Sequence, residues 1–246
     1  MNGKLRKKTL LILNYAVNPN HPIFGHQYET IQHLAGYFEK IIVITNEYNA
    51  TALPENVNVH LSGWEDSKAL KSAFRFYKTL FRVTASQRID FAFAHMVDVQ
   101  SMLAGPIFKI RRIRNVLWYA HARKSFYLVI ASKFTDIIVS SSKGSMPLKN
   151  NKIKLIGQAI DTDVFIFNLK SKHKNQIHKL VHIGRLDESK KITEIISFVN
   201  QTSSGDNDIR IDFYGRLNES FYSKSLKDQF SAKSSIVKYC GSIERK

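Results

Sequence analysis

The segment His182–Lys191 (HIGRLDESKK) carries the strongest sign of chemistry in this sequence. An apolar run ends at Gly184, and Arg185 follows at once. Lys190 and Lys191 then stand at the predicted start of the next helix. A guanidinium fork, an ammonium point charge and the amides of a helix N-terminus can together hold a diphosphate. The same residues could equally form a solvated basic loop, and their chemistry alone does not choose between the two.

Three further residues lie where predicted strands end or a helix begins. Gly25 opens a helix, where a cluster of backbone amides suits a phosphate or an anionic sugar group, although a single glycine there is also an ordinary turn. His121 ends the run NVLWYAH. Its imidazole could hydrogen-bond a substrate or stabilise a developing charge, or it could simply cap the next helix. His95 ends the run DFAFAH in the same way, and there the structural interpretation is favoured.

Metal and disulfide chemistry have no support in the sequence. The single cysteine, Cys240, excludes a disulfide framework and a multi-cysteine zinc or iron–sulfur site. The nine histidines show neither the HExxH pattern nor another two-histidine spacing. We therefore expect no metal ion and no cofactor.

The charge balance predicts an anionic partner. Lys and Arg number 37 against 20 Asp and Glu, a formal net charge of +17 at pH 7. Nucleic acid, an anionic membrane and a phosphorylated ligand all fit such a surplus. No nucleic-acid-binding motif is present and most aromatic residues fall in strand or core positions, so we do not expect nucleic acid.

A basic stripe runs along one predicted helix, 66–85. Lysine or arginine recurs there at helical spacing, at Lys68, Lys71, Arg75, Lys78 and Arg82. Apolar residues flank the stripe at Leu70, Phe74, Tyr77, Leu80 and Phe81. Such a helix can lie on an anionic membrane surface, or its charges can form an ordinary solvated face.

Short apolar runs alternate with helix-length stretches. The predicted strands are 10–16, 40–45, 57–61, 90–95, 115–121, 136–141 and 152–157, and the helices between them are 26–38, 66–85, 97–110 and 124–134. Several of these strands are continuously apolar, as are strands buried on both faces of a parallel sheet. The alternation predicts a doubly wound α/β sheet.

A polar, basic segment separates this sheet from a second α/β series. We expect a first Rossmann-like domain over 1–165, a linker over 166–178 and a second Rossmann-like domain over 179–246. The second series has predicted strands at 179–185, 209–215 and 236–241, about half of a doubly wound domain. A parallel sheet that stopped there would leave an apolar face uncovered, so we expect a C-terminally truncated version of a longer protein.

The sequence favours a cytoplasmic protein. No apolar run approaches the roughly 20 residues of a membrane-spanning helix. The basic start and short apolar run MNGKLRKKTLLILNYA superficially resemble a signal peptide, but no small-residue cleavage site follows. We interpret this run as the first strand.

These segments, in this order, resemble the retaining nucleotide-sugar glycosyltransferases of family 4, which have the two-Rossmann GT-B fold. The matching segments are the Gly25 loop, LWYAH (117–121), IIVSSS (137–142), KLIGQAIDTDVF (154–165), GRLDESKK (184–191) and FYG (213–215). GRL followed by a lysine corresponds to the donor-diphosphate motif of that family. The resemblance implies that Arg185 and Lys190, with Lys191 as the second choice, bind the diphosphate. It also implies that His121 hydrogen-bonds the donor sugar.

The same resemblance implies a reaction. A sugar would pass, with retention, from a UDP- or GDP-linked donor to a glycan or lipid-linked acceptor in cell-envelope polysaccharide synthesis, without a metal ion. A lipid-linked acceptor would bring the protein to the inner face of the membrane as a peripheral protein.

Two departures from the family pattern support an alternative. The glycine loop of the family usually has paired glycines, and here only Gly25 is present. The paired-glutamate motif of the family would fall beyond Lys246. The alternative is a catalytically inactive truncated remnant that serves as a membrane- or partner-binding module.

Overall fold

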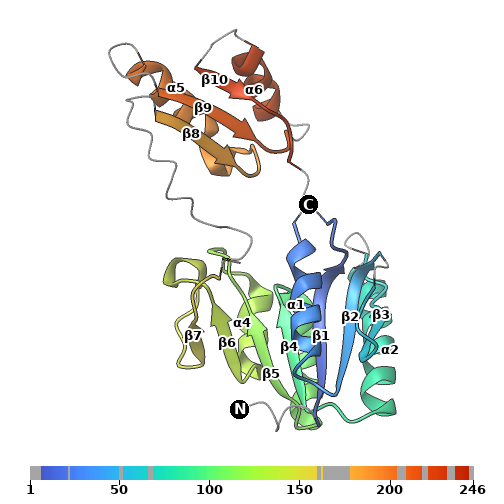
Figure 1. Cartoon of the computed structure of the whole chain (residues 1–246). Helices are drawn as coiled ribbons and strands as arrows, with labels where there is room; N and C mark the ends of the chain where they lie inside the picture. Colours follow the sequence, from blue (N-terminus) through green and yellow to red (C-terminus); the bar gives the residue numbers. More distant parts are fainter. Residues whose placement is uncertain are drawn as a thin grey trace. The chain divides into compact units, whose positions relative to one another are not determined.

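The chain forms two compact α/β units, Met1–Asp161 and Thr162–Lys246 (Figure 1). The structure, a computed structural model, describes residues 7–21, 23–49, 52–65, 69–159, 162, 178–203, 209–217, 221–231 and 236–243. The predicted linker, 166–178, lies outside these ranges except for His178, which begins a strand.

The first unit is built around a seven-stranded parallel sheet. Its strands are β1 (Thr9–Val17), β2 (Lys40–Tyr48), β3 (Val57–Leu61), β4 (Phe91–His95), β5 (Arg114–Trp118), β6 (Ile137–Ser140) and β7 (Ile153–Leu155). In space they follow the order β3-β2-β1-β4-β5-β6-β7, and every neighbouring pair is parallel. The order reverses between β1 and β4, and ligands of open α/β sheets bind at the carboxyl ends of the strands beside such a reversal.

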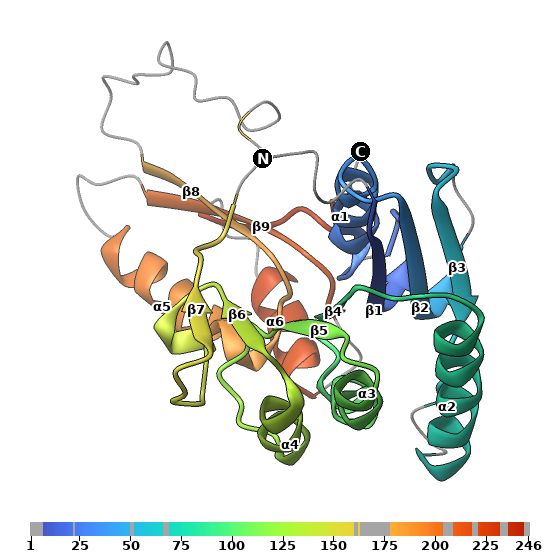
Figure 2. The same cartoon turned by 90° about the horizontal axis from the view of Figure 1, so that it is seen from below.

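Helices cover both faces of this sheet. They are α1 (Gly25–Ala35), α2 (Ala69–Ser86), α3 (Asp98–Ile110) and α4 (Phe126–Phe134). Figure 2 shows α1 on one face and the other three on the opposite face. Leu10 and Ile12 of β1 belong to the core under α1, whereas Leu11 and Leu13 belong to the core that contains Phe76 of α2. Burial on both sides explains why β1 is a continuous apolar run.

The second unit has a three-stranded parallel sheet in the order β10-β9-β8. The strands are β8 (His178–Ile183), β9 (Ile209–Tyr214) and β10 (Val237–Tyr239), and the helices are α5 (Ile192–Thr202) and α6 (Phe221–Ser231). Phe213 is fully buried at the centre of its core, which also contains Ile196 and Leu226. Val181 and Ile183 of the edge strand β8 are exposed.

The predicted α/β fold with two Rossmann-like sheets is confirmed, and every predicted strand has a counterpart in it. The clearest difference is at β5, which was expected to run to His121 and ends at Trp118. His121 therefore lies in the loop that follows the strand. Among the described residues, no helix combines the length and apolar character needed to span a membrane.

Helices α3 and α4 pack closely at a glycine. A Cβ atom built on Gly105 would lie 2.5 Å from Cβ of Phe134, so the two helices meet where only a hydrogen atom fits. This contact fixes the distance between α3 and α4, and α4 begins directly after the 119–125 loop that carries His121.

We predict that Gly105→Ala destabilises the first unit. Alanine is the better helix former, but its methyl group would force α3 and α4 apart, and overpacking of this kind costs about 1–3 kcal/mol. Urea denaturation measures the free energy of unfolding. The control is Gly36→Ala, because the nearest atom to a Cβ there is 3.7 Å away. Equal stability of Gly105→Ala and wild type would refute the packing argument.

Candidate functional site

The strands of the second unit end in glycines that hold their carboxyl ends together. The Gly184 amide donates to the carbonyl of Tyr214 at 3.0 Å, and the Gly215 amide donates to the carbonyl of Gly241 at 2.8 Å. A Cβ atom on Gly215 would lie only 1.7 Å from the carbonyl oxygen of Gly184. Any side chain at Gly215 would therefore push β8 and β9 apart.

Arg185 stands directly after this glycine corner. Its side chain is 63% exposed, and Nη1 lies 3.3 Å from Oδ2 of Asp187. Asp187 also accepts hydrogen bonds from the amide and the hydroxyl of Ser189. The Ser189 hydroxyl and the charges of Arg185 and Lys190 hold the pKa of Asp187 below its usual value. Arg185 is thus presented to solvent beside one ionised carboxylate.

The two lysines of the segment differ in their partners. Lys190 ends a short 3-10 turn, η3 (Glu188–Lys190), and is exposed. Within the described ranges, no carboxylate pairs with the Lys190 side chain. Lys191 has a left-handed backbone with φ of 55° and pairs with Glu194 at 3.1 Å. The structure therefore leaves the Lys190 ammonium the more available of the two.

The N-terminus of α5 is partly occupied. The amide of Thr193 donates to the hydroxyl of Tyr222 at 3.3 Å, and the Thr193 hydroxyl donates to the same oxygen at 3.2 Å. A tyrosine from α6 thus takes one of the amides that the sequence assigned to an anion. Fewer amides of α5 are therefore open to an anion, and the exposed side chains of Arg185 and Lys190 become the more important candidates for binding one.

In the first unit, His121 lies on a loop held by several hydrogen bonds. The hydroxyl of Tyr119 donates to the carbonyl of Arg123 at 2.7 Å, and Ser125 caps α4 by accepting from the amide of Leu128 at 2.9 Å. Nδ1 of His121 accepts from the amide of Arg123 at 2.9 Å. A neutral ring in this arrangement carries its proton on Nε2. The exposed side chain therefore presents a hydrogen-bond donor from a preorganised loop.

The Gly25 loop uses its amides internally. The amide of Gly25 donates to the carbonyl of His21 at 3.0 Å. Nδ1 of His21 accepts from the amides of Ile23 and Phe24 at 3.1 and 2.9 Å. The histidine thus caps the entry to α1, and the Gly25 amide is not free for a phosphate in this structure.

Gln27 of α1 joins the carboxyl ends of β1 and β4, where the strand order reverses. Its side-chain oxygen accepts from the amides of Tyr15 and Ala16 at 3.2 and 3.1 Å, and Nε2 donates to the carbonyl of His95 at 3.3 Å. The residue is almost completely buried. Sequence reasoning missed Gln27 and His21, because a lone glutamine or histidine near a helix start has no distinctive spacing.

On α2, the basic stripe is exposed but not uniformly available. Lys71, Lys78 and Arg82 are exposed, whereas Arg75 pairs with Glu65. Lys68 lies outside the described residues. Among the apolar residues, Leu70, Phe74 and Phe81 are 90%, 72% and 52% exposed. Leu80, expected on this flank, is instead fully buried, because it lies on the side of the helix that packs on the sheet.

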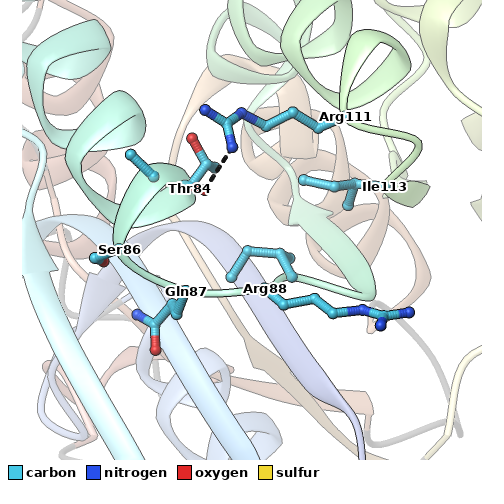
Figure 3. A pocket seen from close by; sticks show the side chains of 8 residues that line it. Thr84, Ser86, Gln87, Arg88, Arg111 and Ile113 are labelled. Atoms are coloured by element: carbon cyan, nitrogen blue, oxygen red, sulfur yellow. Dashed lines mark hydrogen bonds between the residues drawn. The ribbon is translucent and has the colours of Figure 1, made fainter.

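A pocket of about 480 Å³ lies at the amino ends of strands β4 and β5, away from the carboxyl ends that carry the predicted site residues (Figure 3). It is lined by residues 84–89, Arg111 and Ile113, which precede β4 and β5. Nη1 of Arg111 donates to the carbonyl of Thr84 at 2.7 Å. Both α2 and α3 end here, and helix C-termini disfavour anions. This pocket is therefore a poor site for a phosphorylated ligand.

The predicted residues are divided between the two units. Arg185, Lys190 and Lys191 lie on one stretch of the second unit, and Gly25 and His121 follow strands of the first. In the ranges that the structure describes, no group of three or more His, Cys, Asp or Glu residues could hold a metal ion.

Comparison with solved structures shows the fold. The Anabaena protein HepE, solved in complex with UDP, matches with a TM-score of 0.64 and 14% identity over 96% of this chain and 69% of that one. The lipopolysaccharide outer core galactosyltransferase WaaB matches with a TM-score of 0.62 and 9% identity over 96% of this chain and 68% of that one. The chain has the GT-B fold. A UDP-GlcNAc 2-epimerase from Methanocaldococcus jannaschii also matches, with a TM-score of 0.55 and 13% identity over 97% and 74% of the two chains. No family model and no curated protein sequence matches.

We predict that acid destabilises the first unit through His95. This residue is buried beside His26, and burial together with the His26 charge lowers the pKa of His95 to about 4. An unfolded histidine titrates near 6.5, so between pH 6.5 and 4 the unfolded chain takes up a proton that the folded chain refuses. Stability is complete above pH 6.5 and falls by up to about 3 kcal/mol as the pH drops to 4.

Urea denaturation at several pH values measures this loss. His95→Gln should flatten the pH dependence. His33→Gln, which removes an exposed histidine from α1 and keeps His95, should retain it. Identical pH profiles for His95→Gln and wild type would contradict the assignment.

Proposed function

We propose that this chain is a glycosyltransferase that moves a sugar, with retention, from a UDP- or GDP-linked donor to a glycan or lipid-linked acceptor of the cell envelope. The proposal rests mainly on Arg185 and Lys190. Both side chains are exposed, and they follow the glycine at the carboxyl end of β8. The fold is shared with glycosyltransferases, and one of its neighbours was solved with UDP. The likeness to family 4 motifs supports the retaining mechanism.

In this proposal, cationic side chains stabilise the leaving group. The bond between the anomeric carbon of the sugar and the phosphate oxygen breaks, and negative charge grows on the departing diphosphate. Arg185 and Lys190, with Lys191 as the second choice, neutralise that charge, a role assigned here to side chains rather than to a metal ion. His121 donates a hydrogen bond from Nε2 to the donor sugar.

The acceptor completes the reaction without an enzyme nucleophile. Its hydroxyl oxygen attacks the anomeric carbon from the face that the diphosphate leaves. Its proton passes to the departing phosphate oxygen. Retention follows because bond formation and bond breaking occur on the same face. Gly25, at the start of α1, stays a predicted contact for the donor diphosphate, and such a contact would have to compete with the bond from its amide to the carbonyl of His21.

We predict that a nucleoside diphosphate stabilises the chain and that Arg185→Ala abolishes this effect. A ligand at 100 times its dissociation constant stabilises by about 2.7 kcal/mol, which thermal denaturation detects easily. The screen uses UDP, GDP, ADP and their common sugars. Lys190→Ala should weaken binding more than Lys191→Ala, because Lys191 is already paired with Glu194.

Arg210→Ala is the matched control, since it removes an exposed arginine from the opposite end of β9. A response to one nucleotide that disappears in Arg185→Ala supports the donor site. No response to any nucleotide would contradict it and favour the inactive module. Conversion of a UDP-sugar into an epimeric sugar product in the absence of an acceptor would instead favour an epimerase reaction.

The exposed face of α2 supports a second proposal, peripheral binding to an anionic membrane at its cytoplasmic face. The exposed apolar residues Leu70, Phe74 and Phe81 recur at spacings of four and seven, so they lie along one side of the helix. The exposed cations Lys71, Lys78 and Arg82 form the adjacent stripe. Apolar insertion and attraction to anionic headgroups act together in such a helix, and each basic residue contributes about 1 kcal/mol.

We predict that the chain sediments with vesicles containing phosphatidylglycerol and not with vesicles of phosphatidylcholine alone. Replacing Lys71, Lys78 and Arg82 by Gln should weaken this binding by more than tenfold, since three contributions of about 1 kcal/mol are lost. Phe74→Ser should also weaken membrane binding. The binding free energy lost in this variant should change little with salt concentration, because the lost contribution is apolar.

The control replaces Lys133, Lys143 and Lys149 by Gln, which removes the same charge from exposed positions elsewhere in the first unit. An equal loss of binding in this control would show that net charge, rather than the α2 face, attracts the membrane.

A further inference from the structure

The two strands that meet at the glycine corner end in the same short sequence. Residues 183–189 read IGRLDES, and residues 214–220 read YGRLNES. We call the triplets 184–186 and 215–217 the first and second GRL turns. In the sequence only the first turn is followed by the lysines of the diphosphate motif, so the repetition by itself indicates no role for the second turn. In the structure β8 pairs with β9, so the two turns lie next to each other.

The residues of the GRL triplet occupy corresponding positions in the two turns. The glycines, Gly184 and Gly215, are the closely approaching pair. The leucines, Leu186 and Leu217, contribute to the core of the second unit. The arginines are exposed. The same pattern thus occurs twice. The glycine lies where the two strands come close, the arginine is exposed to solvent, and the leucine faces the core.

Pairing of the strands places the two arginines side by side. Ile183 is paired with Tyr214 in the parallel register, and the amide of Leu186 donates to the carbonyl of Arg216 at 3.3 Å. The backbones of Arg185 and Arg216 are therefore neighbours across adjacent strand ends, which lie about 4.8 Å apart in a sheet. Like charges at such positions are destabilising unless something between them is negative.

The two guanidinium groups differ in their surroundings. Arg185 lies beside the carboxylate of Asp187. At the position that corresponds to Asp187, the second segment has the uncharged Asn218, which lies outside the described residues. Among the residues that the structure describes, no carboxylate pairs with Arg216, so within this part of the chain Arg216 has no ion pair to give up when an anion binds.

We propose that Arg216 is a second binding residue for the diphosphate, so that the two GRL turns hold the anion between paired guanidinium groups. The inference rests on the proposed donor site and adds a contact to it. Two fork-shaped donors suit a diphosphate, which offers oxygens on two phosphorus atoms. The partly occupied N-terminus of α5 makes a second cationic side chain more important here.

Titration calorimetry of the whole chain with UDP, uridine and inorganic pyrophosphate tests the proposal. Arg216→Ala should raise the dissociation constant for UDP at least about tenfold, as loss of a charge-assisted contact does. Arg216→Lys should restore only part of the affinity, because an ammonium group lacks the fork. Arg210→Ala, on the same strand at the opposite end, should bind UDP as wild type does.

Thermal denaturation without ligand separates binding from structural support. Arg216 is exposed and pairs with no described carboxylate, so Arg216→Ala should melt no lower than wild type. A marked fall in melting temperature for both Arg216→Ala and Arg216→Lys would assign Arg216 a structural role and overturn the proposal.

The remaining outcomes distinguish this inference from the proposed function. If Arg185→Ala loses UDP and Arg216→Ala keeps wild-type affinity, the donor site stands and the role of Arg216 is refuted. If wild type binds none of the nucleoside diphosphates of the thermal screen, the proposed function fails. Pyrophosphate binding that Arg216→Ala weakens would then still support paired guanidinium groups, and its absence would overturn both.

Discussion

The candidate site depends on one close contact between backbones. At Gly215 a side chain would occupy the position of the Gly184 carbonyl oxygen, so β8 and β9 can end together only because Gly215 carries no Cβ atom. Hydrogen bonds from Gly184 to Tyr214 and from Gly215 to Gly241 then join three strand ends into one edge. Arginines that follow such corners are placed by the backbone itself. Their positions do not depend on long flexible loops.

In the first unit, polar groups at the corresponding edge serve mainly to hold the scaffold. Gln27 satisfies amides of β1 while binding the end of β4, and His21 satisfies amides at the entry to α1. Buried amides left without partners would be costly, so these side chains stabilise the irregular backbone at the point where the strand order reverses. His121 is different, because its ring is exposed and only one of its nitrogens is used by the loop.

Much of the fold could be predicted because strands buried on both faces are continuous apolar runs, as β1 and β2 are. Details that depend on contacts between distant residues could not. The end of β5 before His121, the hydroxyl of Tyr222 at the start of α5 and the burial of Leu80 follow from packing partners that spacing does not reveal. Arg216 could have been found from the repeated GRL triplet, yet only strand pairing shows why the repeat matters.

The ion pair between Arg185 and Asp187 has a consequence for selectivity among anions. The carboxylate of Asp187 already contacts the guanidinium group of Arg185. It therefore competes with any other anion for this group. A singly charged anion gains little from that exchange, because it substitutes one negative charge for another. A polyanion gains more, because it meets several cations at once. In the proposed donor site, the carboxylate of Asp187 would thus disfavour singly charged anions relative to a diphosphate.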